Sequence, residues 1–359
     1  MRIGLLIYGS LETLSGGYLY DRKLVEALRR QGHELQIISL PWRNYAAHLG
    51  DNLYYRLPSG LDVLIEDELN HPSLLTANLH RPMPQYPVIS LVHHLRCSEG
   101  RPRWQNALYR IVESRYLNSV DGFVFNSNTT RSVVTDLVGN TRPGIVAYPP
   151  TDRFGSALPE AFVHARATES GPLRLLFLGN VIPRKGLQTL LEAVSKQNDT
   201  GGNLPVSLDV IGSLTADPTY ARRMQAFAQT HGLQSFVRFH GALDEVALAE
   251  QLRQAHLLVV PSSYEGFGIV YLEGMGFGLP AIGTSAGAAA EIIHDGMNGY
   301  LIAPADTQTL AAHLTTLAQD RALLVQLSLN ALERYRQQPP WEQTATEIGA
   351  FLMGVREGN

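Results

Sequence analysis

Apolar runs of strand length alternate with helix-patterned segments along almost the whole chain, and this alternation constrains the fold more than any other feature. In the first half, the runs lie at residues 2–8, 34–41, 61–65, 87–94, 121–127 and 143–150. In the second half, they lie at residues 173–180, 206–212, 236–241, 256–262, 280–285 and 299–304. Strands that alternate with helices form parallel sheets with right-handed crossovers. The sequence therefore predicts an α/β protein with two doubly wound, Rossmann-like domains.

The chain has 359 residues, which favours two domains. The strand–helix rhythm is lost over 151–173, which we interpret as a linker. We predict an N-terminal domain over 1–153 and a C-terminal domain over 154–340. A final helix at about 341–359 follows Pro339-Pro340, and we expect it to pack back on the N-terminal domain.

Composition excludes several classes of protein. Hydrophobic residues make up 45% and charged residues 17% of the chain, so a large core can form and disorder is not expected. A net charge of −4 argues against a nucleic-acid-binding protein. The one cysteine, Cys97, cannot form an internal disulfide, and the start of the chain has no signal-peptide pattern. We expect a cytoplasmic protein.

Two carboxylates, Glu265 and Glu273, stand eight positions apart in the stretch 261–299. An apolar strand precedes them, and Gly266-Phe267-Gly268 and the start of a helix lie between them. In an open α/β sheet, ligands bind at such strand–helix junctions. Loop glycines and a helix N-terminus favour an anion, whereas ionised carboxylates accept hydrogen bonds from sugar or ribose hydroxyls.

A second junction of this kind carries two cations. Arg184, Lys185 and Gly186 follow the strand at 173–180 and precede a helix, which suits a diphosphate. The alternative for this motif alone is solvated surface charge. Four further candidates for ligand contacts lie within or directly after the next two strands: Gly212, Ser213, Arg238 and Phe239.

The second half resembles the retaining glycosyltransferases of family four. The segments that carry the resemblance are FLGNVIPRKGLQTLLEA, DVIGS, VRFHGAL and HLLVVPSSYEGFGIVYLEGMGFGLPAIGTSAGAAAEIIHDGMNGYLIAPAD. Glu265 and Glu273 correspond to the family's E-x7-E signature. The match extends over about residues 173–306, and the first half matches more loosely. The resemblance implies the GT-B architecture, in which two Rossmann-like domains face a cleft.

The resemblance also implies roles for the acidic stretch. Glu273 would bind the ribose hydroxyls of a nucleotide-diphosphate sugar, and Glu265 would bind hydroxyls of the transferred sugar. The backbone at Gly266, Phe267, Gly268 and Ile269 would contact the diphosphate or the sugar.

Further roles follow for the cations and the N-terminal domain. Lys185 would neutralise the departing diphosphate with support from Arg184. Gly16 and Gly17, which end the loop after the first strand, would lie under the donor phosphates or the acceptor. His93 would sit near the sugar, although the residues alone leave open whether His93 or His94 does so.

One departure from the family pattern is Asn180, which stands where an arginine is usual. The expected reaction transfers a hexosyl group from a UDP- or GDP-sugar to an acceptor hydroxyl with retention of configuration, in glycan, glycolipid or polysaccharide biosynthesis. The alternatives are another GT-B-like enzyme, such as a phosphorylase or epimerase, and a catalytically silent sugar-nucleotide-binding subunit. Asn180 favours the last of these, whereas Lys185, Glu265 and Glu273 oppose it.

We expect no cofactor and no bound metal. Glu66, Asp67 and Glu68 resemble an acidic metal-binding triplet, but we interpret them as a loop near the acceptor or as surface charge. The acceptor is expected to be a saccharide or a lipid-linked molecule. The segment 101–120 interleaves arginines and aromatic residues on a helical pattern. It is either a surface helix with one buried face or a face that contacts anionic lipid at the inner side of the membrane.

Overall fold

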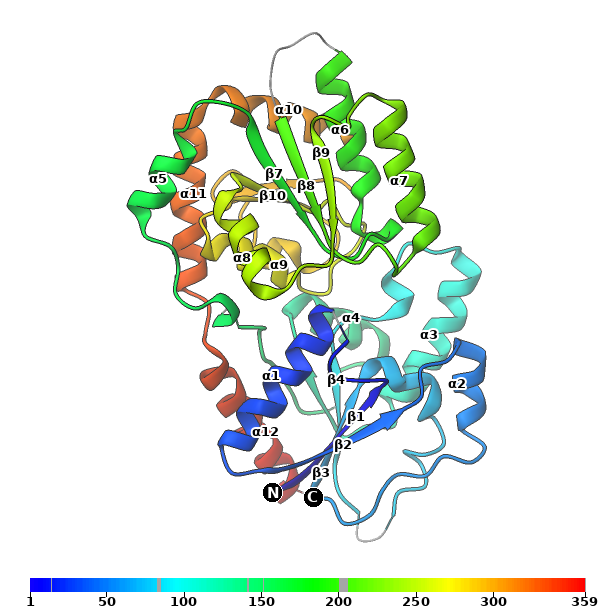
Figure 1. Ribbon diagram of the computed structural model, residues 1–359. Coiled ribbons are helices and arrows are strands. Elements are labelled where there is room, and N and C mark those ends of the chain that lie inside the picture. The colour runs from blue at the N-terminus through cyan, green and yellow to red at the C-terminus, as the bar shows by residue number, and fades with distance from the viewer. Residues whose placement is uncertain (14, 83–84, 141, 151, 200–205, 359) are drawn as a thin grey trace. The chain divides into compact units, whose positions relative to one another are not determined.

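The computed structural model describes residues 1–13, 15–82, 85–140, 142–150, 152–199 and 206–358. The chain divides into two compact units (Figure 1). The first unit comprises Met1–Pro150 and Pro339–Asn359, and the second comprises Thr151–Gln338. The first unit thus ends at residue 150, three residues before the predicted position at 153. The C-terminal helix belongs to the first unit.

The first unit is built on a six-stranded parallel sheet with the strand order β2-β1-β3-β4-β5-β6. The strands are β1 (Arg2–Tyr8), β2 (Glu34–Leu40), β3 (Val63–Asp67), β4 (Val88–Val92), β5 (Gly122–Phe125) and β6 (Gly144–Val146). The helices are α1 (Gly16–Arg30), α2 (Tyr45–Asp51), α3 (Arg103–Leu117), α4 (Asn128–Val138) and α12 (Trp341–Gly358), with short 3-10 turns η1 (Glu68–Ser73) and η2 (Arg96–Ser98).

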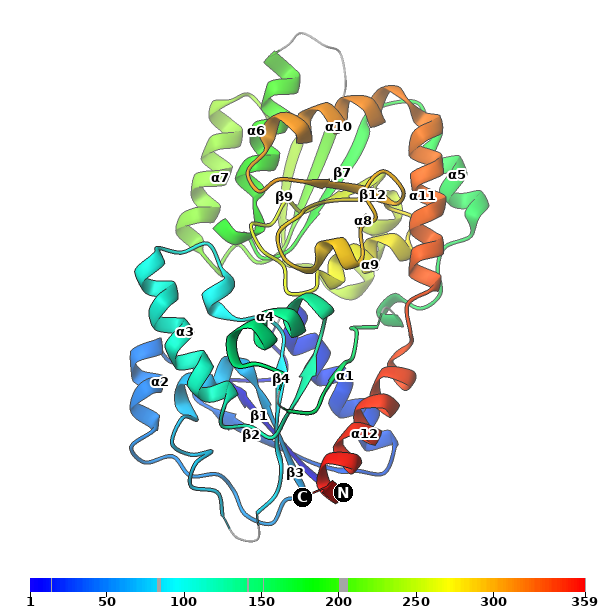
Figure 2. The same ribbon diagram turned by 180° about the vertical axis from the view of Figure 1, so that it is seen from behind.

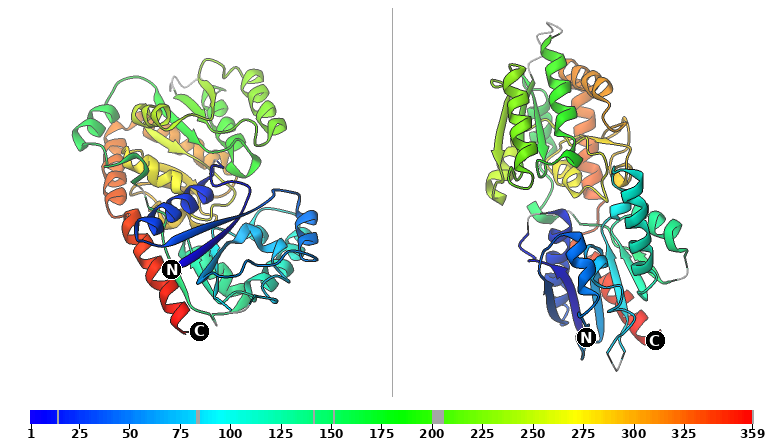
Figure 3. Two further views of the ribbon diagram at one scale, coloured as in Figure 1. Left: turned by 60° about the horizontal axis from the view of Figure 1, so that its bottom comes forward. Right: turned by 90° about the vertical axis from the view of Figure 1, so that its right-hand side faces the viewer.

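Helices cover both faces of this sheet (Figure 3). On one face, Leu24 and Leu28 of α1 and Ile348 of α12 pack on inward side chains of β1 and β3. On the other face, Tyr116 at the end of α3 and Val134 of α4 belong to a second apolar cluster. The apolar residues of these strands point to both faces, as expected for a parallel sheet that is buried on both sides.

The second unit has six parallel strands in the order β12-β11-β10-β7-β8-β9. The strands are β7 (Leu173–Leu178), β8 (Val206–Ile211), β9 (Val237–Gly241), β10 (Leu257–Val259), β11 (Ala281–Thr284) and β12 (Gly299–Ile302). The helices are α5 (Glu160–Ala167), α6 (Leu187–Asp199), α7 (Pro218–Thr230), α8 (Glu245–Gln254), α9 (Ile269–Gly276), α10 (Thr307–Gln319) and α11 (Arg321–Arg336), with 3-10 turns η3 (Asp152–Phe154), η4 (Pro183–Lys185) and η5 (Ala288–Glu291). Figure 2 shows α10 and α11 from behind.

The interpretation of 151–173 as a plain linker is wrong. The turn η3 and the helix α5 lie in this stretch, and both belong to the second unit. Val163 and Ala167 of α5 are buried, and Arg166 donates to the Gly278 carbonyl at 3.0 Å. The helix was missed because it is short and its apolar side is only weakly periodic.

No helix of the described residues combines the length and apolarity that a membrane span would need.

Candidate functional site

The strand order of the second unit places two predicted site residues side by side. From β7 the chain first builds β8 and β9 on one side, and then β10, β11 and β12 on the other. The sheet therefore reverses its direction of growth between β7 and β10, and ligands of doubly wound sheets bind at such a point. Lys185 lies beyond the end of β7, and Glu265 lies beyond the end of β10.

Lys185 and Glu265 form a buried ion pair. Lys185 Nζ lies 2.5 Å from Glu265 Oε1, and the Ser262 hydroxyl donates to the same oxygen at 2.5 Å. Burial raises the pKa of Glu265, but the charges of Lys185 and Arg184 outweigh it, so the net pKa is lowered. Burial lowers the pKa of Lys185, against the opposing attraction of Glu265. Glu265 is therefore held ionised in a site that excludes most water.

Arg184 has a different position from Lys185. Its Nη1 donates to the Tyr264 carbonyl at 2.9 Å and lies 3.7 Å from Glu265 Oε2. Arg184 therefore ties the two loops together at the rim of the pair, while Lys185 makes the direct contact.

Close backbone packing holds the loops after β7, β8 and β10. Gly186 has φ +73°, and a Cβ on it would lie 2.0 Å from the Pro261 carbonyl oxygen. A Cβ on Gly212 would lie 1.9 Å from the Gly179 carbonyl oxygen, and Val181 donates to the Ser213 carbonyl at 3.0 Å. Gly212 and Ser213 thus support the loop that carries Lys185.

Glu273 projects from α9, which begins at Ile269. It is the fifth helical residue, a little over one turn into the helix. Gly268 caps the helix at φ +94° without a side chain, and Phe267 before it is buried. The first-turn N–H groups of α9 are therefore not capped by the Gly268 residue, and this end of the helix favours an anion.

Arg153 holds Glu273 and is a site residue that the sequence analysis missed. It donates to Glu273 Oε1 at 2.9 Å through Nη1, and to Glu245 Oε1 at 2.9 Å through Nε. Burial raises the pKa of Glu273, and the charge of Arg153 opposes that rise. No sequence signal marked Arg153, because it lies in the stretch interpreted as a linker.

Arg238 and Phe239 lie on β9, which is the edge strand of the second sheet. Two strands, β7 and β8, separate β9 from β10. Arg238 is exposed and Phe239 is half-buried, and both lie within the strand rather than beyond its end. Their contact with a nucleotide base stays a prediction.

A polar cluster occupies the corresponding point of the first unit. Here the sheet reverses its growth between β1 and β3. The cluster contains Asp21 of α1, Asp67 at the end of β3, Glu68 after it and His93 after β4, and all four residues are buried. Asp21 was missed by the sequence analysis. Its signal was present, because an acid at 21 shares the apolar helical stripe of Leu24 and Leu28.

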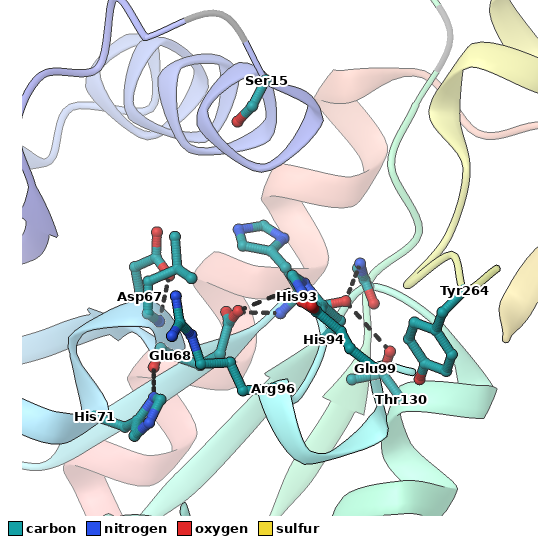
Figure 4. A network of polar contacts seen from close by, with 12 residues as sticks. Ser15, Asp67, Glu68, His71, His93, His94, Arg96, Glu99, Thr130 and Tyr264 are labelled. Carbon is teal, nitrogen blue, oxygen red and sulfur yellow. Dashed lines mark hydrogen bonds and ion pairs between the residues drawn. The ribbon is translucent and has the colours of Figure 1, made fainter. Parts of the chain in front are cut away.

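His93 is the histidine that faces α1. Its Nε2 lies 3.0 Å from Asp21 Oδ1, and its backbone N–H donates to Glu68 Oε2 at 2.9 Å. A Cβ on Gly17 would lie 3.3 Å from the His93 ring, so the glycine leaves room for it. Figure 4 shows the ring pointing toward α1, with Glu68 between His71 and His93.

His94 lies apart from this contact. Its Nε2 is 3.0 Å from Glu99 Oε1, and its Nδ1 is 3.9 Å from Glu68 Oε1. The structure therefore places His93, and not His94, beside Gly17 and Asp21. Gly16 and Gly17 themselves are not loop residues: they form the first turn of α1 after the cap Ser15, whose hydroxyl accepts from the Tyr18 N–H.

The interpretation of Glu66, Asp67 and Glu68 as surface charge is wrong, since all three are buried. Burial raises the pKa of Asp21, Glu66 and Asp67 to about 7 each, and it also raises the pKa of Glu68, with the Asp67 charge adding to the rise. Asp21, Asp67 and His93 each offer one atom that could bind a metal ion. These three atoms lie within 4.8 Å of one another, a spacing that could hold an ion. Bound protons near neutral pH would relieve the same repulsion, so the expectation of no metal stays a prediction.

Known structures define the class of protein. A sucrose-phosphate synthase from Thermosynechococcus elongatus superposes with a TM-score of 0.80 at 19% identity, covering 100% of both chains. HepE from Anabaena, in complex with UDP and glucose, superposes with a TM-score of 0.78 at 16% identity, covering 99% of this chain and 100% of that one. Two six-stranded, doubly wound parallel sheets of this kind are the GT-B fold.

Sequence comparisons identify a family for most of the second unit. Residues 160–334 match the family described as "Glycosyl transferases group 1". A glycogen synthase from Mycobacterium tuberculosis is 26% identical over 291 residues, which are 80% of this chain and 67% of the relative. A D-inositol 3-phosphate glycosyltransferase from Streptomyces avermitilis is 31% identical over 202 residues, which are 54% of this chain and 43% of the relative. These matches place residues 160–334 among the group 1 glycosyltransferases. The chain spans about two thirds of the first relative and less than half of the second.

Proposed function

We propose that this glycosyltransferase moves a hexosyl group from a UDP- or GDP-sugar to an acceptor hydroxyl, with retention of anomeric configuration. The observation that carries the proposal is the buried pair of Lys185 and Glu265 at the reversal point of the second sheet. The pair brings a cation for a phosphate and an acceptor for sugar hydroxyls to one place.

Charge on the leaving group is the main catalytic problem in such a transfer. When the bond from the anomeric carbon to the β-phosphate oxygen breaks, negative charge grows on the nucleoside diphosphate. Lys185 and the N-terminus of α9 are preorganised to stabilise it, with Arg184 at the rim. Because the site is largely buried, each of these interactions is stronger than it would be in water.

The two glutamates divide the recognition of the donor between them. Glu265 is held ionised and would accept from hydroxyls of the transferred sugar, in competition with Lys185 and Ser262. Arg153 donates to Oε1 of Glu273. The second carboxylate oxygen, Oε2, would accept hydrogen bonds from the ribose hydroxyls. The resemblance implies this division, and the positions are compatible with it: Glu265 contacts Lys185, whereas Glu273 lies on α9, further along the chain.

The N-terminal unit would supply the acceptor side. His93 is fixed by Asp21 and Glu68, so its ring is oriented for a hydrogen bond to a donor or acceptor hydroxyl. The proposed step has the acceptor oxygen attack from the face that the diphosphate leaves, and the departing phosphate oxygen takes the acceptor proton. This step needs no enzymic nucleophile and no metal.

UDP is the first nucleotide to test, because the similar structure of HepE was solved with UDP and with UDP-glucose. Binding to the folded state raises the unfolding temperature. We expect a larger rise with UDP or GDP than with ADP, followed by release of that nucleotide from its sugar when acceptors are supplied. Release of a sugar phosphate that depends on inorganic phosphate would instead identify a phosphorylase. Nucleotide binding without turnover over a broad acceptor panel would identify a silent subunit, which Asn180 favours.

Lys185→Ala and Glu273→Ala test the assignment directly. Removing a preorganised charge stabiliser typically lowers kcat by about 10²–10³-fold, and we expect at least such a loss for Lys185→Ala. Lys23→Ala is the matched control, because Lys23 pairs with Glu26 on α1. Near-wild-type turnover in Lys185→Ala or Glu273→Ala would contradict the proposed function.

We expect the protein to keep full activity in the presence of a metal chelator. A loss of activity that magnesium or manganese restores would contradict the metal-free mechanism.

A further inference from the structure

Exposed apolar side chains are concentrated on one part of the first unit. Of the described residues, twelve are large, hydrophobic and exposed, and seven of these lie within residues 42–54 and 104–111. On α3, Trp104, Leu108 and Ile111 are 65%, 57% and 51% exposed. Their spacing of four and three residues puts them on one face of the helix. The other five are scattered over the rest of the chain.

Helix α2 continues this surface. Leu49 on α2 and Leu53 just after it are exposed and four residues apart, and Trp42 is exposed in the preceding loop. The two helices lie side by side in opposite views (Figures 1 and 2), and the rings of Tyr45 and Tyr109 meet at 4.8 Å between their centroids. We call the exposed side chains of residues 42–56 and 103–115 the α2–α3 surface.

The charge on the α2–α3 surface has one sign. Its exposed charged residues are all arginines: Arg43, Arg56, Arg103, Arg110 and Arg115. The two acids in these segments, Asp51 and Glu113, are buried and already engaged. Asp51 forms an ion pair with Arg43 and accepts from Ser73 at 2.7 Å, and Glu113 accepts from the backbone of Arg96 at 2.6 Å. The uncompensated positive charge of the surface therefore rests on the other four arginines. A positive apolar surface on a chain of net charge −4 is complementary to an anionic apolar boundary.

We propose that the α2–α3 surface docks the enzyme on a membrane that contains anionic phospholipid. Arginine guanidinium groups would pair with phosphates, while Trp104, Leu108 and Ile111 would enter the boundary between headgroups and acyl chains. In this proposal, segment 101–120 is both a surface helix with one buried face and a helix with a face that contacts anionic lipid. Glu113, Tyr116 and Leu117 form its buried face, and the apolar stripe and arginines form its docking face.

Two pairs of substitutions separate the electrostatic and apolar parts of this interaction. Flotation of the full chain with vesicles of phosphatidylcholine containing 30 mol% phosphatidylglycerol measures partitioning. We expect Arg103→Gln with Arg110→Gln to lower it about 25-fold, since each arginine near an anionic surface contributes about fivefold. We expect Trp104→Gln with Leu108→Gln to lower it about tenfold or more. Val246→Gln with Arg222→Gln, both exposed on the second unit, should leave partitioning unchanged.

Fluorescence gives a second readout. Of the three tryptophans, Trp42 and Trp104 belong to the α2–α3 surface and Trp341 is buried. Docking should therefore shift tryptophan emission to the blue, and Trp104→Phe should remove a large part of the shift. The experiment needs neither donor nor acceptor, so its failure would leave the proposed transfer reaction untouched.

Three results would overturn the proposal. One is equal partitioning of the wild-type chain onto neutral and anionic vesicles, and another is no partitioning onto either. The third is a dimer in solution that the same α2–α3 substitutions convert to a monomer, because the surface would then be covered by a second copy of the chain.

Discussion

Arg153 shows how a single side chain can set the state of a ligand-binding acid. Glu273 is buried, and burial raises its pKa and so favours the protonated form. The charge of Arg153 opposes that tendency, and Glu245 on α8 shares the guanidinium. The ribose contact proposed for Glu273 would therefore depend on a residue outside the signature motif.

We predict that Arg153→Ala weakens UDP binding about tenfold or more at pH 7, the size expected for a lost hydrogen bond to a charged group. Without Arg153, the pKa of Glu273 rises further, so the variant should lose affinity at a higher pH than the wild type as pH falls. Calorimetric titration with UDP between pH 6 and 8 measures this. Arg336→Ala, which removes a surface pair with Glu160, is the control. Parallel pH profiles for the wild type and Arg153→Ala would contradict the prediction.

Asp21 is a buried acid whose ionisation works against folding. Burial raises its pKa from 3.8 to about 7, so the folded state holds its proton more tightly than the unfolded chain does. Its Oδ2 has no hydrogen-bond partner among the described residues. As pH rises from about 4 through 7, this group therefore removes stability from the first unit.

Asp21→Asn keeps an oxygen for His93 but cannot ionise. We predict that the variant is more stable than the wild type at pH 8, by at most about 4 kcal/mol, and that the difference shrinks toward zero at pH 4. Urea unfolding at both pH values measures it. Asp136→Asn, an exposed change on α4, should show no such trend. A pH-independent difference would mean that folding does not shift the pKa of Asp21.

At the scale of elements, the turn η4 depends on one glycine. Gly186 adopts φ +73° directly after Lys185, against the Pro261 carbonyl that begins the Glu265 loop. A side chain there must push the β7 and β10 loops apart, and these loops carry the two partners of the ion pair.

We predict that Gly186→Ala costs about 3 kcal/mol or more of unfolding free energy and also weakens UDP binding. Gly232→Ala is a matched control. Its φ of +67° gives the same backbone strain, but no heavy atom lies within 4 Å of the added Cβ. Its cost should be only about 1–2 kcal/mol, with UDP affinity unchanged. Equal effects of the two substitutions would show that strain, and not the approach of the loops, is decisive.

The elements also show what the sequence could predict. All twelve strands were predicted from apolar runs, because strands buried on both faces leave an uninterrupted signal. Helices α2 and α5 left none, since they are one to two turns long. The ends that carry Lys185 and Glu265 were predicted separately. The contact between Lys185 and Glu265 was not predicted. It requires β10 to pair with β7, and neither segment contains information about strand order.

The same reason explains the first unit. Glu66, Asp67 and Glu68 read as surface charge because three adjacent acids are usually solvated. Their burial comes from neighbours far along the chain: Asn78 donates to Glu66 at 3.0 Å, and the His93 N–H donates to Glu68.

At the scale of the whole molecule, α12 follows the second unit in sequence but packs in the first unit, so substitutions in α12 should affect the stability of the first unit. Trp341 is buried against Tyr20, with 5.0 Å between ring centroids, in the apolar cluster of the first unit. We predict that Trp341→Ala lowers the stability of the first unit by about 3–5 kcal/mol. Calorimetry should then show the first unit melting earlier, while UDP still raises the transition of the second unit. A UDP shift that disappears in this variant would contradict the separate placement of α12 and the nucleotide site. Met353→Ala, an exposed change on the same helix, is the control.

The return of α12 to the first unit also sets an order of events during translation. The ribosome finishes residues 1–150 long before it makes α12, which packs beside α1 on one face of their sheet. At about 5–20 residues per second, the delay is about 10–40 s. Throughout that interval the second unit can complete its own core, whereas the nascent first unit presents an uncovered apolar strip around Tyr20 and Leu28 to the cell's chaperones. The unit of the protein that is made first is thus the one that matures last.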